Sequence, residues 1–254
     1  MNNFIYDIPT KVYFGQGQIV HLPELIQTCG SRVLLVYGGG SIKKTGLYDT
    51  ITHLLRENGI EWQELSGVQS NPKIGSVREG VRLVREHQLD CVLAVGGGST
   101  LDCSKAICAS VPYTGDPWEL VLDRTKVKSC LPLITVLTMA ATGSEMDNIA
   151  VISNPETKDK RGFSSYGMYP RFSILDPAYT FTVPRSQTAA GTADIMSHIM
   201  ESYFDQVRDA SVQDGLSEAL LKTCIQSAPI ALAHPDDYEA RANLMWAAAL
   251  AING

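Results

Sequence analysis

An aspartate and a histidine four residues apart are the first candidates for chemistry in this sequence. They are Asp194 and His198, in the stretch GTADIMSHIMESYF. Side chains at positions i and i+4 share one face of a helix, so both could contact a single metal ion. Because a catalytic zinc site has three protein ligands and an open position, this pair would be part of such a site. The alternative is a surface pair on a helix, which adds only a few tenths of a kcal/mol, roughly.

A cluster of three glycines is the strongest local signal of a phosphate site. The run VLAVGGGSTLD reads as a buried strand that ends in Gly96, Gly97 and Gly98, with a helix that opens at Ser99. Glycines let a backbone approach a ligand closely, and a helix N-terminus offers free N–H groups to a pyrophosphate. The alternative is a tight turn with a capping box from Ser99 to Asp102. The run is not the GxGxxG fingerprint, and GQGQIV near the N-terminus lacks the flanking strand and helix which that motif requires.

A second glycine cluster, in VYGGGSIKKTG, closes the first strand of the expected sheet. Gly38, Gly39 and Ser41 are followed by Lys43 and Lys44. Many dinucleotide sites carry an acidic residue here, which receives the 2′-hydroxyl of the adenosine ribose. A hydroxyl and ammonium groups would instead attract a 2′-phosphate. The cluster therefore favours NADP(H) over NAD(H), and the alternative is an exposed basic turn.

The elements that must position these residues alternate between strand and helix from residue 32 to residue 176. Short apolar runs such as RVLLVYGGG, CVLAVGGGS, LPLITVLTM and RFSILDP read as strands, and SVREGVRLVREHQ has helical spacing. This alternation predicts a Rossmann-like parallel sheet with helices on both faces. NIAVISNPETKDKRGFSS interrupts the rhythm and predicts a hairpin that projects from the sheet.

The sequence pattern predicts helices throughout the last third of the chain. We expect an α/β domain over 1–180 and an all-helical domain over 181–254. The helical runs cover about 186–207, 211–231 and 236–252. The final run, RANLMWAAALAING, is strongly apolar and needs partners to cover it. Because about 70 residues is small for an independent domain, we expect the helical domain to be incomplete and the natural chain to continue past Gly254.

Composition limits the function classes. A net charge of −6 argues against a nucleic-acid or anionic-membrane surface. The N-terminus lacks a signal-peptide pattern, and no apolar run approaches 18 residues. Six cysteines without CxxC spacing predict free buried thiols and a reducing, cytoplasmic setting.

Six motifs in order resemble the iron-containing (group III) alcohol dehydrogenase family, in the dehydroquinate synthase-like superfamily. They are FGQG, SNP at 70–72, GGGSTLDCSK at 96–105, LTMAATGSE at 137–145, FSILDPAYT at 172–180 and GTADIMSHIMESY. The resemblance spans essentially the whole chain. YGGGSIKKTG and RANLMWAAALAING resemble the NADPH-dependent butanol dehydrogenase and aldehyde reductase branch.

The resemblance implies a role for individual residues in binding NADP(H). It places Gly97, Gly98 and Ser99 around the pyrophosphate and Asp102 on the nicotinamide side. Thr138 and Thr142 would contact the cofactor, Asn71 would lie at the adenosine end, Lys160 would bind the nicotinamide ribose, and Tyr179 would line the adenine pocket. Gly38 stands where NAD-using relatives carry an aspartate, which again favours NADP(H).

The resemblance also implies that Asp194 and His198 are two of four ligands to Fe²⁺ or Zn²⁺. Two further histidines of the family pattern are absent from this chain. The implied function is metal-dependent hydride transfer between NADP(H) and a short-chain alcohol or aldehyde, by a cytoplasmic homodimer. The alternatives are a polyol dehydrogenase, a lyase-type synthase of the same superfamily, and a non-catalytic NADPH-binding fragment. No nucleic-acid or membrane partner is expected.

Overall fold

A six-stranded parallel sheet forms the centre of the first part of the chain. The computed structural model describes residues 3–205 and 209–254. The strand order is β1-β8-β5-β4-β2-β3, and every neighbouring pair is parallel. The strands are β1 Lys11–Phe14, β2 Arg32–Tyr37, β3 Glu61–Leu65, β4 Cys91–Gly96, β5 Leu133–Leu137 and β8 Phe172–Leu175. The predicted parallel sheet is therefore confirmed.

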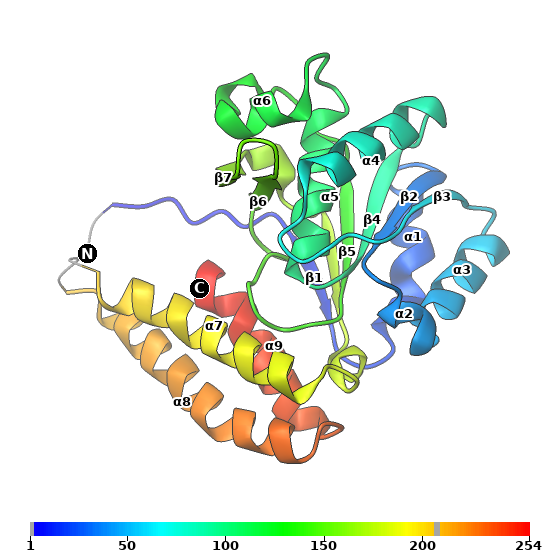
Figure 1. Cartoon of the computed structure of the whole chain (residues 1–254). Coiled ribbons are helices and arrows are strands. Elements are labelled where there is room, and N and C mark those ends of the chain that lie inside the picture. Colours follow the sequence, from blue (N-terminus) through cyan, green and yellow to red (C-terminus); the bar gives the residue numbers. More distant parts are fainter. Residues whose placement is uncertain (1–2, 206–208) are drawn as a thin grey trace.

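Helices cover both faces of this sheet, as Figure 1 shows. Successive side chains of a strand point to opposite faces, so Leu34 and Val36 join one core and Val33 and Leu35 join another. Strands buried on both faces read as continuous apolar runs, which is why β2 and β4 are recognisable in the sequence. The first core is completed by α4 Ile74–Glu86, α5 Gly98–Ser110 and α6 Pro117–Leu122. The second core is completed by α1 Leu22–Gln27, α2 Ser41–Lys44 and α3 Leu47–Glu57.

The predicted hairpin is also present. Strands β6 Ile149–Asn154 and β7 Asp159–Ser164 pair antiparallel and form a sheet of their own. Strand β6 packs on α5, and Ser153 forms a parallel bridge to Lys73. The hairpin therefore lies beside the helix that follows the glycine cluster.

Three long helices follow the sheet. They are α7 Arg185–Tyr203, α8 Ser211–Ala233 and α9 Tyr238–Asn253. Their shared core includes Ile195, Ile199, Leu220, Cys224 and Leu244. Residues 206–207 of the first predicted helix lie outside the described residues. Short 3₁₀ turns occur at η1 Gln18–His21, η2 Arg124–Lys126, η3 Tyr166–Met168 and η4 Pro177–Thr180.

The change from α/β to all-helical structure falls between η4 and α7, close to the predicted boundary at residue 180. The helical part packs directly on the α/β part, since α9 contacts η4 and Asn253 bonds to Gly143. The division into two domains at that point remains a prediction.

One local expectation is wrong. The glycine pair of GQGQIV follows a strand, because β1 ends at Phe14 and Gly15 comes next. This strand is four residues long, at the edge of the sheet and partly exposed. It therefore lacks the buried apolar run by which the other strands are recognised. Gly17 donates its N–H to Asp176 Oδ2 at 2.9 Å, which fixes the turn against the end of β8.

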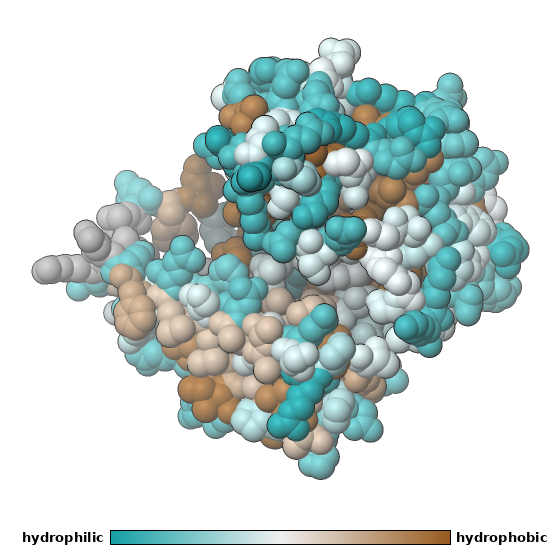
Figure 2. Space-filling model, in the orientation of Figure 1, coloured by the Kyte–Doolittle hydropathy of each residue, from teal (hydrophilic) through white to brown (hydrophobic). Residues whose placement is uncertain are grey.

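The surface differs between the two parts (Figure 2). Hydrophilic residues dominate the visible face of the α/β part, whereas hydrophobic residues gather over α7 and α8. Large apolar side chains exposed on or next to these helices are Met200, Phe204, Val212, Ile225 and Ile230. Within the described residues, none of the helices combines the length and the apolar character needed to cross a membrane.

Candidate functional site

A cavity opens where the chain reverses its direction along the sheet. After β2 the chain adds β3 on one side, and it then returns to add β4 on the other side of β2. In open α/β sheets, ligands bind beyond the carboxyl ends of the strands at such a switch point. The cavity lies there, next to Gly38 after β2 and Gly96 at the end of β4, and has a volume of about 240 Å³.

Seven of the twelve predicted cofactor residues line this cavity. They come from the two glycine clusters, the loop after β5 and η4, namely Gly38, Ser41, Gly97, Gly98, Ser99, Thr138 and Tyr179. These segments are distant in sequence and meet only because their strands are neighbours. Thr138 is held by its N–H, which donates to the Gly96 carbonyl at 3.0 Å. The side chain of Tyr179 is partly buried, and this burial raises the pKa of its phenol.

Packing requires glycine at two positions of the first cluster, Gly96 and Gly98. A Cβ on Gly96 would lie 2.5 Å from Thr100 Oγ1, and a Cβ on Gly98 would lie 2.6 Å from Thr142 Oγ1. A side chain at either position would therefore clash with a threonine. Helix α5 begins at Gly98 behind the extended Gly97, and no side chain caps it. Its first N–H groups are thus available to a ligand.

The capping box that was the alternative for this cluster does not form. Ser99 lies inside α5, and the carboxylate of Asp102 turns away from the helix start. It accepts hydrogen bonds from Ser144 Oγ at 2.8 Å and from the Val151 N–H at 3.0 Å. The capping box is therefore absent from the described part of the chain, and the role of this cluster in ligand binding stays a prediction.

Five predicted cofactor residues lie outside the lining of the cavity. Two of them contact each other, since Lys160 Nζ donates to Asn71 Oδ1 at 2.7 Å. Asn71 is left-handed, with φ of 52°. Thr142 reaches the site indirectly, because its hydroxyl packs on Gly98. The other two are Gly39, whose Cβ position is open space, and Asp102.

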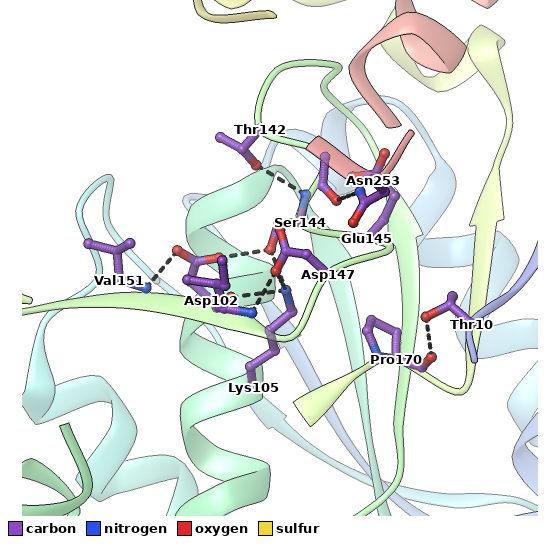
Figure 3. Close-up of polar contacts among 12 residues, drawn as sticks. Thr10, Asp102, Lys105, Thr142, Ser144, Glu145, Asp147, Val151, Pro170 and Asn253 are labelled. Carbon is purple, nitrogen blue, oxygen red and sulfur yellow. Dashed lines mark hydrogen bonds and ion pairs between the residues drawn. The ribbon is translucent and has the colours of Figure 1, made fainter. Parts of the chain in front are cut away.

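Asp102 belongs to a buried polar cluster that joins α5 to the loop after β5 (Figure 3). Lys105 is fully buried, and its Nζ donates to Ser144 Oγ at 2.9 Å, to Asp147 Oδ1 at 2.6 Å and to the Ile149 carbonyl. Burial raises the pKa of Asp102, although the nearby Lys105 charge acts against this. The cluster fixes the loop that carries Thr138 beneath the cavity.

One buried carboxyl in the same loop is not satisfied. Among the residues that the structure describes, Glu145 Oε1 has no hydrogen-bond partner, and Glu145 is 1% exposed. Burial raises the pKa of this carboxyl to about 7. The loop is held at this point through its main chain, because Ser173 Oγ donates to the Glu145 carbonyl at 2.6 Å. This residue was not singled out from the sequence, since nothing local distinguishes it from a surface glutamate.

The predicted metal ligands lie together on α7. Asp194 Oδ1 is 3.7 Å from His198 Nε2, and Glu201 Oε2 is 4.0 Å from His198 Nδ1. Both predicted ligands are partly exposed. Across residues 3–205 and 209–254, no group of three or more His, Cys, Asp or Glu side chains is placed to hold a metal ion. The structure thus brings the two predicted ligands together without a third.

The cavity also recruits residues that the sequence did not single out. Val68 and Ser70 precede Asn71, and Met139 follows Thr138. Val183 precedes α7, and Gln187 lies in its first turn. Their proximity to predicted residues in the sequence is the only signal that could have found them. Ile42 on α2 and Thr45, which directly follows α2, line the cavity beside Ser41, whereas Lys43 and Lys44 do not.

Two family models divide the chain between them. The model described as iron-containing alcohol dehydrogenase matches residues 9–177, and the model described as Fe-containing alcohol dehydrogenase family, C-terminal, matches residues 188–254. The chain belongs to the iron-containing alcohol dehydrogenase family. The family boundary lies between residues 177 and 188, where the sheet gives way to α7.

Relatives in this family carry names with different cofactors. Over 254 residues the chain is 59% identical to NADH-dependent butanol dehydrogenase A of Clostridium acetobutylicum. The match covers 100% of this chain and 65% of that protein. It is 44% identical over 257 residues to the NADPH-dependent aldehyde reductase YqhD of Escherichia coli, of which it covers 66%. The chain therefore spans about two thirds of the length of these iron-containing alcohol dehydrogenases.

The fold matches the same family. The crystal structure of NADH-dependent butanol dehydrogenase A from Thermotoga maritima superposes with a TM-score of 0.97 at 44% identity. The match covers 100% of this chain and 64% of that chain. The parallel sheet followed by helices is thus the architecture of an iron-containing alcohol dehydrogenase.

Proposed function

We propose that this chain is the dinucleotide-binding part of a metal-dependent oxidoreductase that interconverts short-chain alcohols and aldehydes. The observation that carries the proposal is the cavity at the switch point between β2 and β4. It gathers two glycine clusters, the free N–H groups of α5 and the hydroxyl of Thr138. Family membership adds the reaction class, because the curated relatives are named as alcohol dehydrogenases and aldehyde reductases.

The residues of the cavity would divide the work of binding. The N–H groups at the start of α5 would hold the pyrophosphate, since a helix N-terminus favours negative charge. Gly97 and Gly98 would let it approach the backbone, and Thr138 would hydrogen-bond the cofactor. Asp102, kept in place by Ser144, would lie toward the nicotinamide. When bound, the dinucleotide supplies the hydride and a divalent metal polarises the substrate oxygen.

Asp194 and His198 would hold that metal. A carboxylate oxygen and an imidazole nitrogen suit both Fe²⁺ and Zn²⁺. Two donors are fewer than the three protein ligands of a catalytic zinc site, so Asp194 and His198 supply only part of the ligand set that the metal needs. We infer that tight metal binding requires donors in addition to these two.

The cofactor is proposed to be NADP(H). Gly38 and Ser41 lie at the end of β2 where a carboxylate would select for NAD(H), and both line the cavity. The names of the relatives include both NADH- and NADPH-dependent enzymes. Preference for the phosphorylated form is therefore a property to be measured on this chain.

We further propose a cytoplasmic homodimer that acts on short aliphatic substrates. The cytoplasmic setting is supported by six free cysteines, four of them buried, and the substrate class by the names of the relatives.

Fluorescence titration of the 254-residue chain with NADH and NADPH tests the binding step. We expect saturable binding of at least one of the two, and a Ser99→Pro variant would remove an N–H group from the site and weaken it. Absence of binding for both dinucleotides would defeat the proposal. Binding without oxidation of NADPH by an aldehyde, in the presence of Fe²⁺ or Zn²⁺, would favour the non-catalytic alternative.

Metal binding has a matched control within the chain. His53 Nε2 lies 3.3 Å from Glu57 Oε1 on α3, so it forms a second pair with the same i, i+4 spacing. We expect His198→Ala to abolish whatever Zn²⁺ affinity calorimetry detects, and His53→Ala to leave it unchanged. Equal losses in both variants would mean that the α7 pair is an ordinary surface pair.

A further inference from the structure

Lys43, the first lysine of the second glycine cluster, does not line the cavity. Helix α2 starts at Ser41, and residues of a helix are about 100° apart around its axis. Ser41, Ile42 and Thr45 line the cavity, which places Lys43 on the opposite side of the turn. The Lys43 ammonium group, one of the two that the sequence predicted near a 2′-phosphate, is therefore directed away from the cavity.

Lys43 is held on that far side by two aromatic rings and one carboxylate. Its Nζ lies 4.3 Å from the centre of the Tyr48 ring and 5.2 Å from the centre of the Tyr37 ring. It also lies 3.9 Å from Glu64 Oε2 on the neighbouring strand β3. A cation over aromatic rings and near a carboxylate is stabilised by both.

Glu64 organises this cluster. Tyr37 donates its hydroxyl to Oε2 at 2.6 Å, and Tyr48 donates its hydroxyl to Oε1 at 2.5 Å. Trp62 Nε1 adds a long hydrogen bond of 3.4 Å. Burial alone would raise the pKa of Glu64, but these hydrogen bonds and the Lys43 charge outweigh it and lower the pKa. The carboxylate is thus ionised at neutral pH and cancels the charge of Lys43.

Neither Lys43 nor its partners contribute to the wall of the cavity. Tyr37 ends β2, one residue before Gly38, so the cluster lies directly behind the turn that would meet the adenosine ribose. On the cavity side, the same turn presents the Ser41 hydroxyl and backbone. A 2′-phosphate bound there would meet no neutralising charge from Lys43.

We propose that Glu64 is a specificity-determining residue that withholds Lys43 from the 2′-phosphate of NADPH and so limits the preference for NADPH over NADH. The inference rests on the proposed binding of a dinucleotide in this cavity. Once its charge partner is removed, Lys43 can reorient around the short helix toward the phosphate, which NADH does not have. Glu64 would then act on the ratio of the two affinities without touching either cofactor.

The test compares the natural 254-residue chain with four variants by fluorescence titration with NADH and NADPH. In Glu64→Gln the side chain keeps its shape and one acceptor oxygen but loses its charge. We expect this variant to bind NADPH about fivefold more tightly and its affinity for NADH to change by less than about twofold, because only NADPH carries the 2′-phosphate charge. The NADPH gain should shrink in high salt.

Two lysine variants identify the source of that gain. If Lys43 is withheld in the natural chain, Lys43→Met alone should change NADPH affinity by less than about twofold. The double variant Lys43→Met with Glu64→Gln should lose the fivefold gain. Glu61→Gln serves as control, because it removes the same charge at the other end of β3, and it should leave both affinities unchanged.

Each remaining outcome counts against the inference. A loss of NADPH affinity in Lys43→Met would mean that Lys43 already serves the phosphate, and a gain retained in the double variant would mean that Lys43 is not involved. An unchanged affinity ratio in Glu64→Gln, in a variant that binds NADH normally and is therefore folded, would also overturn it. If no form binds either dinucleotide, the proposed function fails, which is a separate result.

Discussion

Asn253 Nδ2 donates a hydrogen bond to the main-chain oxygen of Gly143 at 3.2 Å, across 110 residues of sequence. Gly143 is left-handed, with φ of 64°, and a Cβ there would lie 2.8 Å from the Ala248 carbonyl. The end of α9 thus packs against the loop that carries Thr138 and Thr142. The helical part of the chain thereby supports the loop that forms one wall of the cavity.

Asn253→Ala should lower the free energy of unfolding by about 1–2 kcal/mol, because a buried main-chain acceptor loses its partner. Asn253 Nδ2 also donates to the Ala249 carbonyl, four residues earlier, at 2.8 Å. Asn58→Ala is the matched control, since Asn58 Nδ2 donates to the Leu54 carbonyl, likewise four residues earlier, but to no distant residue in the described part of the chain. Urea denaturation of both variants measures the difference. Equal effects would show that the bond to Gly143 adds nothing.

Lys105→Met should destabilise the chain by about 3–5 kcal/mol, because it leaves Asp147 buried without a counter-charge. Arg82→Met is the comparison, since Arg82 pairs with Glu79 and Glu86 on an exposed face of α4. That change should cost less than about 1 kcal/mol. Thermal unfolding distinguishes the two, and similar melting temperatures would contradict a structural role for the buried pair.

Glu145→Gln should alter how stability depends on pH. The folded-state pKa of Glu145 is raised to about 7, whereas the ordinary value is 4.5. Between these values the folded protein binds the proton more tightly than the unfolded one, so this group makes stability fall as pH rises from 4.5 to 7. The fall is on the order of 3 kcal/mol and levels off above pH 7.

The measurement for Glu145 is the difference between the stabilities of the natural chain and the Gln variant from pH 4.5 to pH 8. Taking this difference removes the contributions of other titrating groups. The variant should gain relative stability with increasing pH. A difference that stays constant across this range would show that Glu145 ionises normally.

Gly98→Ala should weaken dinucleotide binding by more than about tenfold. The added Cβ would collide with Thr142 Oγ1, so Thr142 or the start of α5 would have to move. Gly75→Ala, on α4, is the control, since a Cβ there meets nothing within 4 Å. We expect Gly75→Ala to bind normally and to be no less stable. Titration with NADH and NADPH measures both variants, and normal binding by Gly98→Ala would show that close approach at this glycine is not needed.

Local sequence patterns determined much of this protein. The buried strands were visible because strands covered on both faces are continuously apolar. The glycine clusters marked the strand ends that line the cavity, and the spacing of Asp194 and His198 placed them on one helix face. These features depend on neighbours within a few residues, so local chemistry specifies them. The family resemblance carried by six ordered motifs was likewise correct.

The tertiary structure decided what depends on distant partners. Strand β1 was missed because its stability comes from pairing with β8 and not from its own apolar content. The unsatisfied carboxyl of Glu145 and the full burial of Lys105 follow from packing among segments far apart in sequence. The direction of Lys43 was decided by Glu64 on a neighbouring strand. The residue type determines the charge of a side chain, but only the fold determines whether a side chain of opposite charge already lies beside it.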